Sequence, residues 1–230
     1  MQSRFALRMG PALAALVALL GSCSTGPNSG PAQPISLFNG RDLQGWTAVT
    51  GDPAVRGDAV WTLRDGILVC RGEPIGYLQT DRNFTNFRME AEYRWAPGTP
   101  PGNSGLFSRL DGDPRPLPRC VEVQLMHGNA GDVLGLQGRR IAPDQPRHFH
   151  VAAHPLAGDI DGVRKTTDAE APPGSWNRVE ILAEGPNYTV WINGVEVNRV
   201  TGVEVLSGPV ALQSEGGEIH FRHLHITPLP

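Results

Sequence analysis

The chain has 230 residues, with 20 Lys or Arg against 23 Asp or Glu and a formal net charge of −3. This length suits one domain preceded by a leader. The mildly acidic balance makes nucleic acid a poor candidate partner, because nucleic-acid-binding domains carry basic surfaces. No protein partner is evident from the sequence either.

The first 22 residues are predicted to be a signal peptide of the lipoprotein type. Arg4 and Arg8 precede an apolar run, Ala12–Leu20, that is too short to span a bilayer, and small residues then lead to Cys23. We expect Cys23 to be lipidated, which makes the protein exported and lipid-anchored to the bacterial cell envelope. An ordinary secretory signal is the alternative. Residues 23–34 are rich in Gly, Ser, Pro and Asn and are predicted to be a flexible tether.

Residues 35–230 show short β-type runs separated by turn residues, and no amphipathic helix of ten residues or more. Asp65-Gly66 and Asn193-Gly194 each lie between two such runs, which predicts two tight hairpins. Residues 128–174 are long, rich in Gly and Pro, and predicted to be a loop. The pattern predicts an all-β fold, a two-sheet sandwich of the jelly-roll type.

Three runs carry the polar side chains of most interest. Residues 87–95 alternate between apolar and charged side chains, residues 105–109 include Arg109, and residues 120–126 place Glu122 and Gln124 opposite Val121, Val123 and Leu125. If the three runs join one sheet, their polar faces form one surface. That surface would carry Glu90, Glu92, Arg109, Glu122 and Gln124.

Cysteine and histidine give weaker signals. Cys70 and Cys120 are able to form a disulfide in an exported protein, but their pairing cannot be read from the sequence. Four histidines fall in or just before the long loop, and we favour ordinary loop histidines over a transition-metal site; they are His127, His148, His150 and His154.

Nine short motifs occur in an order that resembles the 3-keto-disaccharide hydrolase domain family, long known only as a domain of unknown function. They are Phe38–Trp46, Leu63–Leu68, Gly76–Thr80, Asn103–Arg109, Val121–Gln124, Gly174–Asn177, Asn193-Gly194, Val210–Gln213 and Phe221–Ile226. The resemblance covers roughly Ile35 to Leu229. It implies a concanavalin A-like jelly roll and cleavage of glycosides whose sugar carries a ketone at carbon 3. The chain departs from the family at His127, where Asp is frequent, and at His223, where Asn is usual.

A ketone at carbon 3 acidifies the hydrogen on carbon 2, so a base can remove that proton, the enolate can expel the group on carbon 1, and water can add back. Such a site needs a base, a group that stabilises the enolate and a proton donor. The sequence predicts Glu122 as the base, Arg109 as the enolate-stabilising group and Glu92 as the second acid. It predicts that four further residues bind the carbohydrate substrate: Gln124, Glu90, Asn103 and His127.

Two other functions fit the same residues. Glu90 and Glu92 would lie about 6.5–7 Å apart on one strand face, within the roughly 5–9.5 Å used by conventional two-carboxylate glycosidases. Tryptophans at the rim of a cleft would instead suit a non-catalytic, lectin-like carbohydrate-binding module; the candidates are Trp46, Trp61, Trp176 and Trp191. The sequence requires no cofactor and leaves a divalent metal open.

Overall fold

The computed structural model describes residues 32–141 and 145–230. The predicted signal peptide (1–22), Cys23 and most of the tether (23–34) therefore lie outside the described residues. Within the described ranges, no helix is long and apolar enough to cross a membrane.

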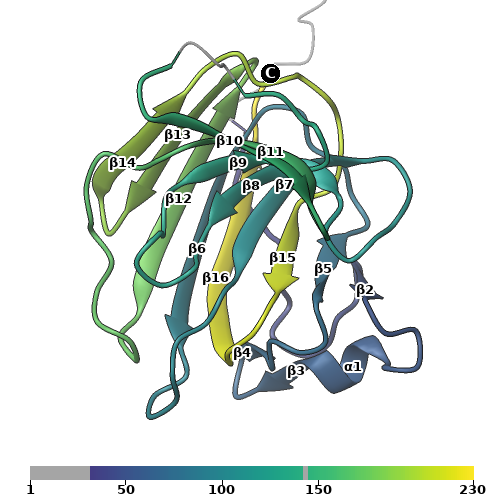
Figure 1. Cartoon of the computed structure of the whole chain (residues 1–230). Helices are drawn as coiled ribbons and strands as arrows, with labels where there is room; N and C mark the ends of the chain where they lie inside the picture. The colour runs from purple at the N-terminus through teal and green to yellow at the C-terminus, as the bar shows by residue number, and fades with distance from the viewer. Residues whose placement is uncertain (1–31, 142–144) are drawn as a thin grey trace, which may run out of the picture. The chain divides into compact units, whose positions relative to one another are not determined.

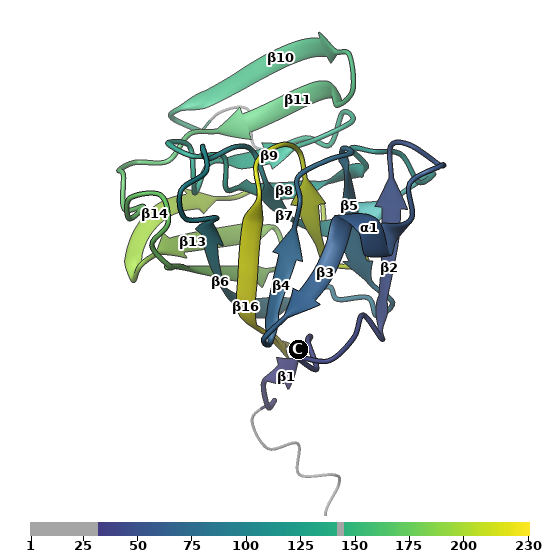
Figure 2. The same ribbon diagram turned by 90° about the horizontal axis from the view of Figure 1, so that it is seen from below.

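Residues 32–230 form one compact unit built from two antiparallel eight-stranded sheets (Figures 1 and 2). Sheet A has the order β14-β13-β12-β6-β16-β4-β3, and β1 pairs with β16. Its strands are β1 (Ile35–Ser36), β3 (Trp61–Arg64), β4 (Ile67–Cys70), β6 (Phe87–Trp95), β12 (Asn177–Glu184), β13 (Asn187–Ile192), β14 (Val195–Val200) and β16 (Ile219–Pro228).

Sheet B has the order β10-β11-β9-β8-β7-β15-β5-β2. The described residues contain one short helix, α1 (Gly57–Val60), between β2 and β3, so the predicted all-β sandwich is confirmed. The strands of sheet B are β2 (Trp46–Thr50), β5 (Gly76–Thr80), β7 (Gly105–Asp111), β8 (Arg119–Gln124), β9 (Val133–Gly135), β10 (His148–His154), β11 (Gly158–Val163) and β15 (Ala211–Ser214).

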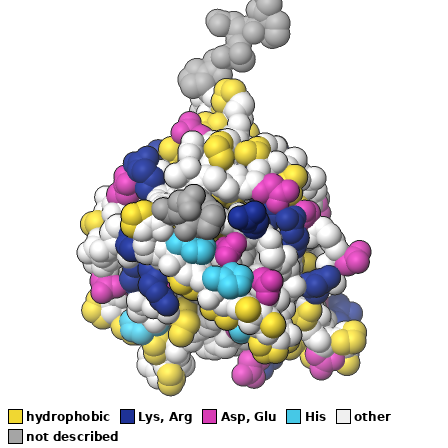
Figure 3. All heavy atoms as spheres, turned by 45° about the horizontal axis from the view of Figure 1, so that its top comes forward, with side chains coloured by type: hydrophobic (Ala, Val, Ile, Leu, Met, Phe, Trp, Pro, Cys, Tyr) yellow, Lys and Arg dark blue, Asp and Glu magenta, His cyan; other side chains and the backbone are white. Residues whose placement is uncertain are grey.

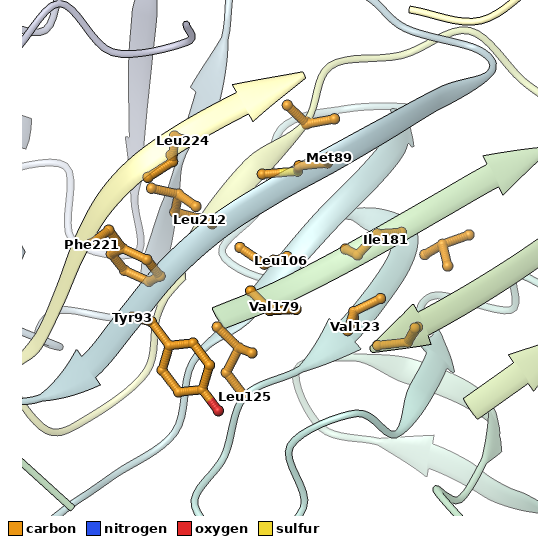
Figure 4. Close-up of a cluster of buried hydrophobic side chains, with 14 of the residues drawn as sticks. Met89, Tyr93, Leu106, Val123, Leu125, Val179, Ile181, Leu212, Phe221 and Leu224 are labelled. Carbon is orange, nitrogen blue, oxygen red and sulfur yellow. The ribbon is translucent and has the colours of Figure 1, made fainter. Parts of the chain in front are cut away.

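The main core lies between the two sheets and follows from strand alternation (Figure 4). Met89 and Tyr93 point inward from β6, Val123 from β8 and Leu106 from β7, and all four are buried in one cluster. Side chains one position away on each strand face outward. A second apolar cluster covers the outer face of sheet B; it includes Tyr77, Phe107, Leu110, Leu117, Cys120, Leu134, Leu136, Ala157 and Ala211.

Both predicted hairpins are confirmed. Asp65 and Gly66 have φ angles of 54° and 75° between β3 and β4, and Asn193 and Gly194 have 52° and 80° between β13 and β14. These left-handed values are the ones that Asp-Gly and Asn-Gly turns supply at low cost.

The predicted loop at 128–174 is wrong, because this segment contributes β9, β10 and β11 to sheet B. Most of β10 is exposed, from His150 to Ala153, and Phe149 is its apolar side chain that packs against the second cluster, so the strand has little buried surface for an alternating pattern to reveal. Strand β9 has only three residues. The β10–β11 ribbon ends sheet B and extends beyond the rest of the sheet in Figure 2.

The expectation that all three polar runs join one sheet is also wrong. Strand β6 lies in sheet A, between β12 and β16, whereas β7 and β8 are neighbours in sheet B. Since β6 and β8 bury their apolar sides in the same core, their polar sides face outward on opposite surfaces of the sandwich. Glu90 and Glu92 therefore lie on the outer face of sheet A, away from Glu122.

Cys70 and Cys120 are free and buried, so no disulfide joins them. Cys70 belongs to the core between the sheets, and Cys120 belongs to the apolar cluster outside sheet B. Burial raises the pKa of the Cys70 thiol to about 11 and that of Cys120 well above its usual range.

Candidate active site

The outer face of sheet B holds a cavity of about 150 Å³ centred on β8. Glu122 faces this cavity because its neighbours Val121 and Val123 occupy the core side of the strand. One wall is apolar and the other is polar, an arrangement common to small-molecule sites. The lining residues are Asn103, Leu117, Glu122, Gln124, Leu134, Leu136, His154, Ala157, Ile160, Gln213 and Glu215.

Gly105 on β7 gives the Glu122 carboxyl its space. It pairs with Gln124 across the β7–β8 ladder, close to the pair formed by Phe107 and Glu122. A Cβ atom at residue 105 would lie 2.4 Å from Glu122 Oε1 and 2.9 Å from Gln213 Oε1. Both oxygens therefore lie close to a position that only glycine leaves open.

We expect Gly105→Ala to disturb the site by crowding alone, because residue 105 has a backbone conformation that alanine can adopt. The added methyl would displace the Glu122 carboxyl and lower the free energy of unfolding by about 1–3 kcal/mol, as overpacking does in other interiors. Urea unfolding measures this loss. Unchanged stability would contradict the close contact between residues 105 and 122.

Glu122 is a carboxyl group held away from water. Its residue is 2% exposed, and its Oε1 has no hydrogen-bond partner. Desolvation raises the pKa of Glu122 well above its usual value, and Glu215 raises it further when Glu215 is ionised. A carboxyl in this state binds its proton more tightly than an exposed Glu, which makes its ionised form a stronger base.

Two neighbours of Glu122 on the β15 side were missed in the sequence. Gln213, at 1% exposure, donates from Nε2 to Glu215 Oε2 at 2.5 Å, while its buried Oε1 has no partner. Burial raises the pKa of Glu215, and a hydrogen bond with Asn103 acts in the opposite direction. Strand alternation in the predicted run 209–213 places Gln213 beside Ala211 on one face, but Glu215 follows the strand and no sequence signal marks it.

Three further polar side chains line the cavity, two of which were predicted. Gln124 uses Oε1 to accept from the backbone N–H groups of Leu125 and Met126, so its NH₂ group is the part left for a ligand. Asn103 has a buried Oδ1 without a partner. His154 was not predicted to bind substrate. Its Nδ1 accepts a hydrogen bond from the Ala157 N–H, so the proton of the neutral ring lies on Nε2.

The structure does not bring Arg109 to this cavity. The β7–β8 register shifts between Ser108 and Asp111, and Arg109 has a φ angle of 52°. This bulge turns the side chain away from the Glu122 face, and its guanidinium lies 5.1 Å from the centre of the Tyr188 ring. It donates to backbone carbonyls in three loops, so the predicted Arg109–Glu122 pair is wrong.

Glu90 and Glu92 have partners on the outer face of sheet A. Arg222 Nε donates to Glu92 Oε2 at 2.6 Å, and Arg178 donates to Glu90 Oε2 at 2.8 Å. Both carboxylates belong to a ladder of exposed and half-exposed ion pairs. Their predicted roles beside Glu122 are therefore ruled out by position.

No tryptophan lines the Glu122 cavity among the residues that the structure describes. Trp46 and Trp61 are buried in the core, and Trp176 lies under the guanidinium groups of Arg94 and Arg222, at 4.5 and 4.0 Å. The described lining of this cavity therefore holds no aromatic platform of the kind that tryptophan gives a sugar ring.

Residues 33–227 match the family described as the 3-keto-alpha-glucoside-1,2-lyase-like domain. The chain belongs to this family. This match confirms the family resemblance read from the sequence. It spans nearly all of the described residues of the sandwich. No functionally curated protein matches the sequence.

Solved structures confirm the jelly-roll class of the lyase-like domain. A Parabacteroides distasonis protein proposed to be a glycosyl hydrolase has a TM-score of 0.61 at 20% identity, covering 86% of this chain and 94% of its own. The Bacillus licheniformis beta-glucanase has a TM-score of 0.54 at 11% identity, covering 88% and 100%. The carbohydrate-binding module CBM66 of Bacillus subtilis has a TM-score of 0.53 at 14% identity, covering 80% and 95%.

The two departures from the family pattern lie outside the cavity of this lyase-like domain. His127 Nδ1 lies 2.9 Å from Glu170 Oε2, and His127 does not line the cavity as predicted for a substrate-binding residue. His223 occupies a bulge of β16 with a φ angle of 52°, on the outer face of sheet A. Asn adopts this left-handed conformation readily, because its short polar side chain can hydrogen-bond to the nearby backbone, so the usual Asn has a backbone explanation.

The remaining histidines of the former loop segment do not form a metal site. His150 Nδ1 lies 2.8 Å from Asp161 Oδ1, and His148 Nε2 lies 3.5 Å from the same oxygen. Figure 3 shows histidine side chains beside acidic and basic ones on one face of the lyase-like domain. In the described ranges, no group of three or more His, Cys, Asp or Glu side chains is arranged to hold a metal ion.

Proposed function

We propose that this protein cleaves glycosides whose sugar ring carries a ketone at carbon 3. Glu122 removes the proton on carbon 2, the resulting enolate expels the group on carbon 1, and water adds to the unsaturated ring. The observation that carries this proposal is the buried, unpartnered carboxyl of Glu122 in a cavity of about 150 Å³. Membership of the 3-keto-alpha-glucoside-1,2-lyase-like family supports it.

The size of the cavity suits a single sugar ring. Pockets for drug-sized ligands measure about 300–1,000 Å³, and this cavity of about 150 Å³ is smaller. The oxidised ring would lie between the apolar wall and the polar side chains, with carbon 2 toward Glu122. The group attached to carbon 1 would then extend out of the cavity.

Neutral donors would stabilise the enolate. Among the described residues that line the cavity, none is Lys or Arg. The NH₂ group of Gln124 and the Nε2–H of His154 are hydrogen-bond donors held by backbone contacts on their other sides. Donors fixed before the reaction cost no reorganisation when charge develops on the ketone oxygen.

Turnover on matched sugars tests the proposal. The purified domain is incubated with 3-keto-trehalose, 3-keto-sucrose and the unoxidised parents, with and without chelator. We expect monosaccharide release only from the oxidised sugars. Cleavage of the parents would favour a conventional glycosidase that uses the carboxyl groups of the same cavity. Binding without any turnover, measured by titration calorimetry, would leave a carbohydrate-binding module.

We also propose that the protein is a lipoprotein anchored to the bacterial cell envelope through Cys23. Ser24 follows the cysteine, which favours the outer membrane in a Gram-negative host. Cys23→Ala should release the protein into the soluble fraction or stall its processing, as measured by membrane fractionation and by the mass of the mature N-terminus. A processed variant that stays with the membranes would contradict the anchor.

A further inference from the structure

We propose that Glu215 is the catalytic residue that protonates the leaving group, and that the depression beside it is the leaving-group subsite. This inference rests on the proposed function and assigns the second half of its chemistry. The subsite would take an alcohol such as the second sugar of a disaccharide.

Glu215 lies where two hollows meet. It lines the cavity of about 150 Å³ around Glu122 and also an adjoining, larger depression of about 360 Å³. The other residues of this depression are Gly72, Glu73, Pro74, Ile75 and Gly216. With the oxidised ring in the inner cavity, the bond from carbon 1 to its oxygen would cross the boundary beside Glu215, and the departing group would occupy the depression.

The inner cavity already has its base, and Gln213 separates that base from Glu215. Gln213 Nε2 donates to Glu215 Oε2. Gln213 Oε1 and Glu122 Oε1 are both buried and unpartnered, and both lie within 2.9 Å of the position that a Cβ atom at residue 105 would take. Glu122 can act as a hydrogen-bond donor only when it is protonated. Once Glu122 has taken the proton from carbon 2, it can donate to Gln213 Oε1, so Gln213 is a positioning residue for both carboxyl groups.

The surroundings of Glu215 suit a proton donor. Burial raises the pKa of Glu215, so its protonated form persists to higher pH than in an exposed Glu, although the hydrogen bond with Asn103 opposes this shift. The other titratable groups that line the inner cavity are Glu122 and His154, and Glu73 lines the depression. None of these groups is a fixed cation that would hold Glu215 ionised.

The steps balance with the two carboxyl groups alone. Glu122 takes the proton from carbon 2, and the electrons of the C2–H bond form the enolate with the ketone at carbon 3. As the ketone is restored, these electrons form the C1=C2 double bond, and the electrons of the C1–O bond leave on the aglycone oxygen. That oxygen takes the Glu215 proton. In hydration, Glu215 as a carboxylate takes a proton from the water that attacks carbon 1, and Glu122 returns its proton to carbon 2. Both groups end in their starting states.

Two substrates with different leaving groups separate the roles. 4-Nitrophenyl 3-keto-glucoside releases a stable phenolate that needs no proton, whereas 3-keto-trehalose releases a sugar alcohol that does. We expect Glu215→Gln to lower kcat/KM on 3-keto-trehalose by roughly 10²–10⁴-fold. The value of kcat/KM on 4-nitrophenyl 3-keto-glucoside should change by less than about threefold. Glutamine keeps the shape and the contact with Gln213, so the variant should fold.

The wild-type protein and one surface variant provide the controls. Glu184→Gln removes an exposed carboxyl at the end of β12 and should leave both rates unchanged. Equal losses on both substrates, or no loss on 3-keto-trehalose, would overturn the role of Glu215 while leaving the proposed function in place. A wild-type protein that cleaves neither oxidised substrate would overturn the proposed function and this role with it.

Discussion

Replacing Glu122 with glutamine should lower kcat on a 3-keto-glucoside by roughly 10²–10⁴-fold, because the substitution keeps the shape of the side chain and removes the base. This loss of kcat should appear both with the nitrophenyl leaving group and with the sugar leaving group of 3-keto-trehalose, whereas Glu215→Gln should affect only 3-keto-trehalose. Since Glu122 must be ionised to act, and burial raises its pKa, wild-type activity on 4-nitrophenyl 3-keto-glucoside, which needs no leaving-group proton, should rise with pH through that raised value. Initial rates across a pH series measure both effects.

The same substitution should change how stability depends on pH. In the unfolded chain the pKa of Glu122 is near 4.5, whereas the folded protein holds the proton to higher pH. Between the unfolded and folded pKa values the folded state binds more protons, so the free energy of unfolding of the wild type falls as pH rises, by about 1.4 kcal/mol per pH unit. Glu122→Gln should lack this fall and should be at least as stable as the wild type at neutral pH.

Two results would contradict the assignment of Glu122. A variant with near-normal kcat would move the base to another titratable group of the cavity, Glu215 or His154. A variant whose stability follows the wild-type pH dependence would show that the Glu122 carboxyl is not held away from water. Glu184→Gln, at an exposed position on β12, is the matched control for both measurements.

The sequence was sufficient to predict the faces of individual strands. Alternation in β6 and β8 correctly separated the core residues Met89 and Val123 from the outward Glu92 and Glu122. Turn residues also located the two hairpins correctly, because strand alternation and turn formation both depend on residues that are adjacent in the sequence. The alternation of one strand carries no information about which strand pairs with it, and so the assignment of β6 to the sheet of β8 was wrong.

The rest of the cavity depends on contacts between distant segments. Gly105 and Gln213 meet Glu122 only because β7 lies between β8 and β15. Glu215 lies after the end of β15, where no periodic pattern applies. His154 reaches the cavity from the β10–β11 ribbon, whose exposed residues gave no strand signal.

Arg109 shows how one irregular residue reverses a correct pattern. The alternation of β7 places Leu106 in the core and Phe107 on the outer face. A left-handed residue at position 109 then interrupts the ladder, and the side chain leaves the face that parity assigns to it. Arg is not among the residues enriched in the left-handed conformation, so the sequence did not predict the bulge at position 109.

We expect Arg109→Met to lower the free energy of unfolding by at least about 3 kcal/mol, because it removes a buried charged donor from three partly buried backbone carbonyls. The guanidinium is fully buried and donates to Gly185 O at 2.7 Å, Glu204 O at 3.0 Å and Thr85 O at 3.1 Å. These carbonyls belong to three separate loops of the sandwich. The midpoint of urea unfolding measures the loss.

The conservative variant and a surface arginine separate this structural role from a catalytic one. Arg109→Lys keeps the charge but loses the planar fork, so it should fall between wild type and Arg109→Met in stability. Arg178→Met removes a half-exposed partner of Glu90 and should cost under about 1 kcal/mol. Assayed well below its unfolding midpoint, Arg109→Lys should retain turnover on 3-keto-trehalose, because the contacts of the Arg109 guanidinium lie outside the Glu122 cavity. A fully stable Arg109→Lys protein without turnover would instead support an enolate-stabilising arginine and contradict the contacts described for residue 109.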